Sequence, residues 1–277
     1  MATAYWINDF VIGGKAVTDG FYLLEGTEYA PALSPRRAVI EAPNTHYAIP
    51  QWDDPMSQIT VSLKIRIAST SPENLTAKWN TLMGLLGMGS NQPVQLTRVR
   101  GTIKEYADAQ LVSMNSPDFS CPRSRVDATI IFQIPGGAWR GPQTDVTFTK
   151  GTSLVLPNAR LSTLPIADAL ILAAGPFNSI TITDDQSNTT VFWYSGATAA
   201  EYILIDPRFM RARRVTTRTF SLSSGSNASA TLEYRNLGPL TFTSRRSGVN
   251  GTASGTFTIA QDGAGSSIEI RSRYAVV

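Results

Sequence analysis

The chain holds a single histidine and a single cysteine, His46 and Cys121, so few catalytic sites can be built from it. A nucleophilic triad needs Ser or Cys beside His, and no Gly-x-Ser-x-Gly turn occurs. His46 lies in the proline-flanked stretch 43–50, and the residues around Cys121 match no cysteine-protease signature. A lone thiol also excludes an internal disulfide and every zinc site with two thiolates. We therefore predict that the protein is no enzyme and binds no cofactor or metal.

Two pairs of adjacent carboxylates, Asp53–Asp54 and Asp184–Asp185, are the remaining candidates for acid–base chemistry. Glycoside hydrolysis needs two carboxyl groups about 5–10 Å apart across a cleft, whereas adjacent side chains on an extended chain point apart. The second pair, with Asn188, could ligate calcium, although the spacing is not that of an EF-hand. We interpret both pairs as turn residues, with calcium binding as the alternative for the second.

Two further groups of side chains favour binding over catalysis. Trp193, Tyr194 and Tyr202 could stack on a sugar ring, or they could fill the interior of a β-sandwich. An arginine-rich segment could attract phosphate groups, but it lacks interleaved aromatic residues beyond Phe209, and the formal net charge of the chain is only +3. We expect this segment to be an exposed loop that docks on acidic surface of a partner protein. Its arginines are Arg208, Arg211, Arg213, Arg214 and Arg218.

The clearest structural element is the alternating run 59–67, in which every second residue is Ile, Val or Leu. This period of two predicts a half-buried strand whose opposite face is polar. Because the apolar face supplies the core, the polar face must meet solvent, a channel or a neighbouring subunit. A helix is predicted over 72–86, with a hydroxyl cap before Pro72, an apolar stripe, and Gly84, Gly87 and Gly89 as its stop. The polar strand residues are Thr60, Ser62, Lys64 and Arg66.

The remaining sequence predicts a mainly β protein with two domains, 1–140 and 141–277. Residues 126–134 alternate like 59–67, and shorter strands are expected at 95–99, 103–106 and 110–114. The Pro/Gly cluster 135–142 is the best linker candidate. Beyond it, about seven short strand runs separated by turn residues predict a β-sandwich or jelly roll. These runs are 179–183, 190–194, 202–205, 218–222, 230–234, 256–260 and 267–274.

The order of these elements resembles the distal tail protein (Dit) family of long non-contractile-tailed bacteriophages. The resemblance extends over nearly the whole chain and is one of pattern. The density of arginine after residue 207 departs from it. The segments that carry the resemblance are Phe10–Gly14, Gly20–Gly26, Gly175–Thr183, Asn188–Tyr194, Glu201–Asp206 and Ser267–Tyr274.

The resemblance implies a structural virion protein at the tip of a phage tail, assembled in the host cytoplasm. It implies a homo-hexameric ring of tail-tube-like N-terminal domains with one inserted helix, around a channel through which DNA passes. The C-terminal domains would be galectin-like sandwiches that project outward. Expected partners are the tail tube protein, the tail hub protein, the tape-measure protein and receptor-binding proteins, with no insertion into a membrane. The alternative function is a carbohydrate-binding module that contacts the host envelope.

Overall fold

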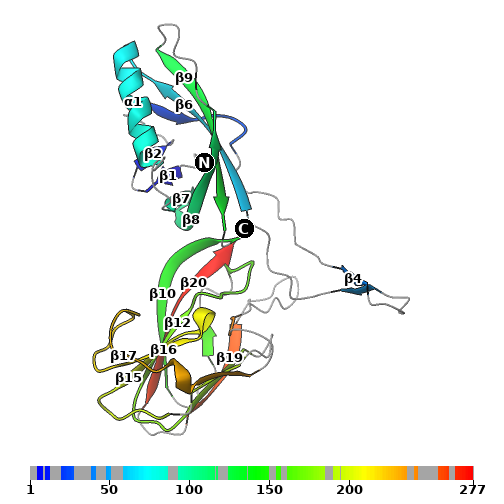
Figure 1. Ribbon diagram of the computed structural model, residues 1–277, viewed down its shortest axis with the longest axis vertical. Helices are drawn as coiled ribbons and strands as arrows, with labels where there is room; N and C mark the ends of the chain where they lie inside the picture. The colour runs from blue at the N-terminus through cyan, green and yellow to red at the C-terminus, as the bar shows by residue number, and fades with distance from the viewer. Residues whose placement is uncertain are drawn as a thin grey trace. The chain divides into compact units, whose positions relative to one another are not determined.

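The computed structural model confirms a mainly β architecture, in which one α-helix accompanies many antiparallel strands among the described residues (Figure 1). No helix in this part of the chain is both long and apolar enough to cross a membrane. The structure describes residues 5–8, 10–12, 20–27, 39–41, 48–50, 59–86, 93–115, 117, 124–135, 137–149, 154–156, 161–184, 190–193, 195–235, 240–242, 255–261 and 266–276.

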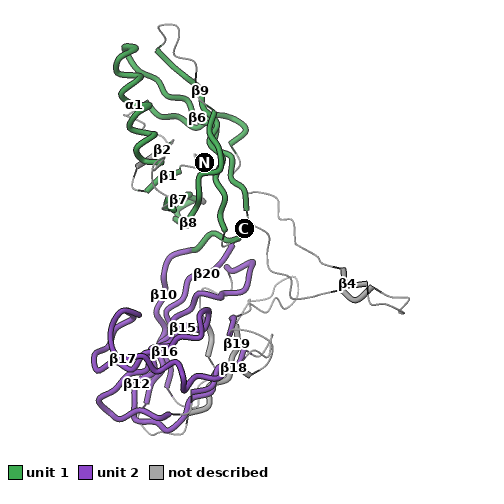
Figure 2. The backbone as a smooth tube through the Cα atoms, viewed as in Figure 1, with its two compact units in different colours: residues 1–140, 277 green, residues 141–276 purple. Residues whose placement is uncertain are grey.

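The chain divides into two compact units, residues 1–140 with 277 and residues 141–276 (Figure 2). The division falls inside strand β10, Trp139–Thr149. Residues 139–142, expected to belong to a Pro/Gly linker, therefore form the start of a regular strand. Trp139 is fully buried, and a Cβ at Gly141 would overlap the ring of Tyr274. The glycine at 141 thus serves close packing rather than flexibility.

The first unit contains one antiparallel sheet in the order β2-β1-β7-β8-β9-β6-β3. Strand β2 also contacts β3, so the two ends of the sheet approach each other. Strand β8 is continuous, with an irregularity between Leu111 and Ser113, where two separate strands were expected. The strands are β1 Tyr5–Ile7, β2 Phe10–Ile12, β3 Phe21–Leu23, β6 Ile59–Ala68, β7 Val94–Arg100, β8 Ile103–Met114 and β9 Arg125–Ile134; β4 Val39–Glu41 pairs separately with β5 Ala48–Pro50.

Strands β6 and β9 form the centre of the first core. They pair antiparallel along their whole length, with Leu63 opposite Ile130 and Val61 opposite Phe132. Residues directly opposite each other lie on the same face, so both apolar sets point inward. Every second residue of β6 from Ile59 to Ile67 is buried, which confirms the predicted alternation.

The predicted helix is α1, Pro72–Leu85. Ser71 is its N-cap, and the Ser71 hydroxyl oxygen accepts a hydrogen bond from the Asn74 backbone N–H at 3.2 Å. The apolar stripe is confirmed, because Leu75, Trp79 and Leu82 are buried and the helix packs against β6. Gly84 was expected to help stop the helix but lies inside its last turn, with open space where a Cβ would be. Gly87 and Gly89, the other expected stop residues, lie outside the described residues.

Replacing Gly84 by alanine should stabilise the protein by about 0.5–1 kcal/mol, because glycine loses more backbone entropy in a helix than alanine does. Beyond its chain neighbours and the backbone of its own helix, the added methyl group meets no atom within 4 Å. Urea unfolding of the wild type and of Gly84→Ala measures the difference. An unchanged or lower midpoint would contradict the placement of Gly84 in a regular helix.

The second unit is a β-sandwich, in agreement with the predicted fold class. One sheet has the order β17-β16-β15-β12-β20-β10 and the other β11-β19-β13-β14-β18. A single apolar core takes side chains from both sheets, including Ile171, Ile203 and Ile182. Its strands are β11 Leu154–Leu156, β12 Leu170–Ala174, β13 Ile180–Asp184, β14 Thr190–Trp193, β15 Tyr202–Asp206, β16 Arg211–Val215, β17 Ser226–Asn227, β18 Leu232–Arg235, β19 Gly255–Gln261 and β20 Ser267–Val276.

Two sequence predictions about this sandwich are wrong. Residues 211–215 form strand β16 and not a loop, because Ala212 and Val215 are buried where β16 pairs with β15. Residues 218–222 form no strand. Their apolar side chains, Phe220 and Leu222, pack instead on a small outer cluster around Leu172 and Leu204.

Candidate functional site

The first candidate surface is the polar side of β6 together with the β9 residues opposite it. The register places Thr60 beside Gln133, Ser62 beside Ile131, Lys64 beside Thr129 and Arg66 beside Asp127. Thr60 and Lys64 are exposed, whereas Ser62 and Arg66 are half-buried. We call these eight residues the β6/β9 polar face.

An ion pair links the two strands at one end of this face. The Arg66 guanidinium donates from Nε and Nη2 to the Asp127 carboxylate at 2.7 and 2.8 Å. Both side chains are well exposed, at 38% and 51%, so water screens the pair. The hydrogen bond from Arg66 is the main reason why the pKa of Asp127 lies below its ordinary value. The pair cancels its own charge and orients both side chains across the strands.

Lys64 supplies the net charge of the β6/β9 polar face. Its backbone is fixed by the neighbouring turn, since the Lys64 N–H donates to Thr27 Oγ1 and the Thr27 hydroxyl donates to the Lys64 carbonyl, both at 3.1 Å. Because Arg66 and Asp127 neutralise each other, the face carries one excess positive charge, that of the Lys64 ammonium. The face therefore offers hydrogen-bonding groups and one cation, which suits contact with a polar partner.

Replacing Arg66 by glutamine should raise the pKa of Asp127 towards its usual range. Because the folded-state pKa is lowered, the pair stabilises the fold above the unfolded pKa, and this contribution is lost as pH falls through the folded value. The carboxylate resonance of Asp127, followed by NMR during an acid titration, measures the shift. Lys64→Gln is the matched control and should leave this pKa nearly unchanged. An equal effect of both changes would contradict the assigned hydrogen bond.

A buried ion pair in the first unit was not anticipated from the sequence. Arg98 of β7 lies opposite Glu105 of β8, and Arg98 Nε donates to Glu105 Oε2 at 2.6 Å. The two side chains are 0% and 5% exposed. The Arg98 guanidinium lies 4.4 Å from the ring centre of Trp139, which also packs against Tyr5. The alternation of β7 could have revealed it, because Arg98 follows Val94 and Leu96 at inward-facing positions.

The arginine-rich segment of the second unit is largely engaged within the chain. Arg208 pairs with Asp206 at 3.2 Å, and Arg214 pairs with Glu201 at 2.9 Å. Arg213 donates to the Gly225 carbonyl at 3.2 Å. Arg218 makes two hydrogen bonds, of 2.9 and 2.8 Å, to the carboxylate of Glu269.

Arg211 differs from these four arginines. Like Arg208 it is exposed and lies beside Phe209, with the two guanidinium groups 5.0 and 5.3 Å from the ring centre. Unlike the side chain of Arg208, that of Arg211 takes part in none of the ion pairs or hydrogen bonds found among the described residues. Phe209 itself is 58% exposed on the short 3₁₀ turn η2, Pro207–Phe209. The η2 turn is therefore an outward-facing part of the segment, and Arg208, Arg214 and Arg218 also fasten the fold through ion pairs.

The candidate sugar-stacking residues do not form an open platform. Trp193 is fully buried between the two sheets, and its indole N–H donates to the Gly196 carbonyl at 3.4 Å. Tyr202 packs against the outer apolar cluster together with Phe220. Tyr194 lies outside the described residues. Of the two described candidates, Trp193 thus belongs to the core and Tyr202 packs on the outer cluster.

The other candidates for chemistry mostly fall outside the described residues. Asp184 is described and buried. Within the described ranges, no group of three or more His, Cys, Asp or Glu side chains is arranged to hold a metal ion. His46, Cys121, Asp53, Asp54, Asp185 and Asn188 are not described.

A search of solved structures found similar folds along the full length of the chain. The crystal structure of the SPP1 Dit protein, described as a paradigm of the hub adsorption apparatus in phages that infect Gram-positive bacteria, matches with a TM-score of 0.59 and 11% identity over 99% of both chains. The phage P2 baseplate in its activated conformation matches at a TM-score of 0.47, with 11% identity over 98% of each chain for the calcium form and 12% over 97% for the strontium form.

Comparisons based on sequence found no such relative. No protein-family model matches the chain. A search of curated proteins found no significant match. The likeness is therefore one of fold. The chain has the fold of the Dit hub protein, as the resemblance of its sequence pattern implied.

Proposed function

We propose that this protein is a structural hub subunit at the distal end of a phage tail. The observation that supports the proposal is the likeness to the SPP1 Dit protein over 99% of both chains, which includes the helix-bearing first unit and the sandwich of the second. Fold alone does not determine function, so the proposal also rests on the surfaces described above. These surfaces offer hydrogen-bonding groups and ion pairs, which suit contacts with other protein subunits.

In this proposal six copies form a closed ring through their first units. A cyclic assembly uses one heterologous contact repeated around an axis. We assign the β6/β9 polar face, with Thr60, Ser62, Lys64 and Arg66, to the central channel or to the seam between neighbouring subunits. DNA and the tape-measure protein would pass through the channel, and the tail tube and tail hub proteins would contact the two sides of the ring.

The second unit acts as the docking platform in this proposal, for hub or receptor-binding proteins. The exposed η2 turn with Arg208 and Arg211, next to Arg213 and Arg214, is the candidate contact. Arg208 and Arg214 are paired with carboxylates, so the excess positive charge comes from Arg211 and Arg213. This charge favours acidic partner surface and would mainly increase the association rate. Direct binding of envelope sugars is the weaker candidate, because the indole of Trp193 is enclosed in the core.

Adding negative charge to the β6/β9 polar face should weaken assembly. Thr60→Glu with Lys64→Glu changes the charge of each chain by −3, one unit for threonine and two for lysine. Around a channel these charges would repel one another, and at a seam they would reverse the charge that the facing surface of the neighbouring subunit meets. Both residues are exposed, so the fold should persist.

The measurement is the fraction of assembled protein by native mass spectrometry at equal concentrations. Asn80→Glu with Lys104→Glu is the matched control, since both residues are exposed, neither belongs to the face, and the charge change is again −3. The proposal expects loss of assembly only in the first double variant. Equal assembly of both double variants would reject the assigned position of the face.

A further inference from the structure

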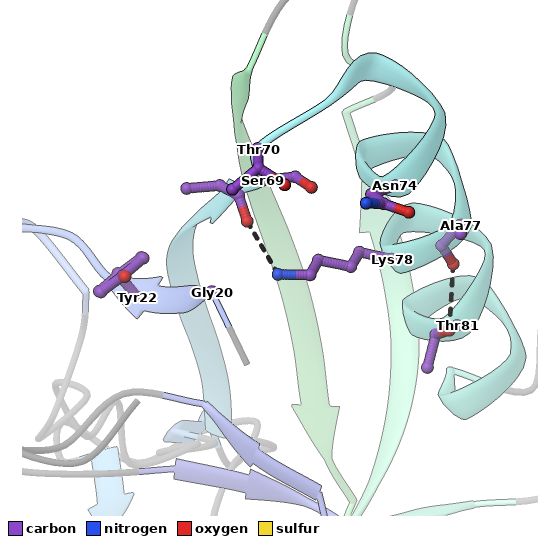
Figure 3. Close-up of a pocket in the computed structure, with 9 residues that line it drawn as sticks. Gly20, Tyr22, Ser69, Thr70, Asn74, Ala77, Lys78 and Thr81 are labelled. Atoms are coloured by element: carbon purple, nitrogen blue, oxygen red, sulfur yellow. Dashed lines mark hydrogen bonds between the residues drawn. The ribbon is translucent and has the colours of Figure 1, made fainter. Parts of the chain in front are cut away.

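An open groove of the first unit remains unexplained by the proposed ring. It has a volume of about 530 Å³ and lies where helix α1 passes the start of β3 and the end of β6 (Figure 3). Ligand-binding sites commonly have volumes of about 300–1,000 Å³. The residues that line it are Gly20, Tyr22, Ala68, Ser69, Thr70, Asn74, Ala77, Lys78 and Thr81.

Helix α1 presents a second stripe to this groove. Asn74, Ala77, Lys78 and Thr81 follow the spacing i, i+3, i+4 and i+7, which places them on one side of a helix. The apolar stripe that includes Trp79 is buried against the core. The groove-lining stripe consists of small and polar residues with a single charge. The helix therefore has a face suited to a polar ligand beside the face that holds it in the fold.

The ammonium group of Lys78 is fixed at the floor of the groove. Lys78 Nζ donates to the Ala68 carbonyl oxygen at 3.0 Å, and the side chain reaches across towards Ser69 (Figure 3). Gly20 makes room for it: its φ is +78°, and a Cβ there would overlap both the Ala68 carbonyl and Lys78 Nζ. An ammonium has three N–H donors, so two remain for a ligand.

Further donors converge on the same groove. Tyr22, Ser69 and Thr70 bring hydroxyl groups, and Asn74 brings a side-chain amide. The hydrogen bonds between described residues include none from these four side chains. Tyr22 is 43% exposed, so an aromatic face is available beside the donors. No acidic residue lines the groove.

We propose that this groove binds an extended, acidic segment of a partner polypeptide. Carboxylates of the segment would be held by Lys78 and the neighbouring donors, and its backbone would lie against Tyr22. A cation with no carboxylate beside it complements negative charge, and the neighbouring hydroxyl and amide groups can add hydrogen bonds to a carboxylate. The groove is built within the first unit alone, so the inference does not depend on the proposed ring.

The test uses the full chain and two blocked peptides of equal length, hexaglutamate and hexaglutamine. Binding is followed by NMR, from the amide shifts of Tyr22, Ser69 and Lys78. We expect hexaglutamate to bind at least about tenfold more tightly than hexaglutamine. Lys78→Gln should remove that preference, and Lys78→Arg should largely retain it because the charge remains. Lys104→Gln is the matched control, as Lys104 is exposed and outside the groove.

Unchanged melting temperatures of the Lys78 variants exclude a loss of fold as the cause. Equal affinity for the two peptides would overturn the inference, as would equal effects of Lys78→Gln and Lys104→Gln. Tighter binding of a neutral oligosaccharide such as maltohexaose, with shifts at Tyr22, would also overturn it and would assign the groove to sugars. The groove lies within one subunit, so peptide binding can be measured on monomeric protein. Absence of peptide binding would leave the ring proposal standing, and absence of a ring would leave peptide binding unaffected.

Discussion

Replacing Arg98 by alanine should destabilise the first unit by about 3–5 kcal/mol, because it leaves the Glu105 carboxylate buried without its charged partner. The pair is 0% and 5% exposed, so water cannot take the place of the guanidinium without opening the fold. The Trp139 ring would also lose the cation that lies 4.4 Å from its centre. Hydrogen exchange of β7 and β8 peptides in urea measures the loss, with peptides of β13 and β14 as an internal reference.

The double variant Arg98→Met with Glu105→Leu provides the control for this prediction. Replacing both partners of a buried ion pair by apolar residues of similar size is often nearly neutral. We therefore expect the double variant to be clearly more stable than Arg98→Ala. If Arg98→Ala alone costs less than about 1 kcal/mol, the pair is solvated and its described burial is incorrect.

Replacing Trp79 by alanine should cost about 3–5 kcal/mol, since it removes the largest side chain with which α1 packs against the sheet. Trp79 is 8% exposed and lies between Leu75 and Leu82 on the buried stripe. Chemical unfolding followed by hydrogen exchange of α1 and β6 peptides gives the difference. Asn80→Ala, on the exposed side of the same helix, should change stability by less than about 0.5 kcal/mol. Similar midpoints for both variants would place Trp79 at the surface.

The elements with a strong period were predictable from the sequence, and those fixed by distant partners were not. The runs 59–67 and 126–134 alternate strictly, so their buried faces could be assigned residue by residue. Residues 211–215 offered no such signal, because arginine occupies both faces of β16 and its pairing with β15 decides the structure. Residues 218–222 alternate like a strand, yet Phe220 is used to cover the outer cluster.

The candidate sites differ in the same way: those on a periodic strand were predictable, and those formed by distant segments were not. The β6 half of the β6/β9 polar face could be named in advance, because the alternate residues of a half-buried strand point away from its apolar face. The β9 residues opposite them follow only from the register. The Arg98–Glu105 pair and the α1 groove arise only when separate segments meet. Gly20 and Lys78, for example, are far apart in the sequence but share the floor of the groove. The arginines of the second unit were expected to be available to a partner protein, but carboxylates of the same chain, such as Glu269, pair with several of them.

Imaging of the purified full-length protein by electron microscopy tests the central claim most directly. The account predicts rings with sixfold symmetry and a central opening, built from six copies of the 30.0 kDa chain, with a mass of about 180 kDa. The same preparation of the Thr60→Glu, Lys64→Glu variant should contain mainly single subunits. Particles that remain single subunits in the wild type at tens of micromolar concentration, or that form an assembly without an axial opening, would contradict the account.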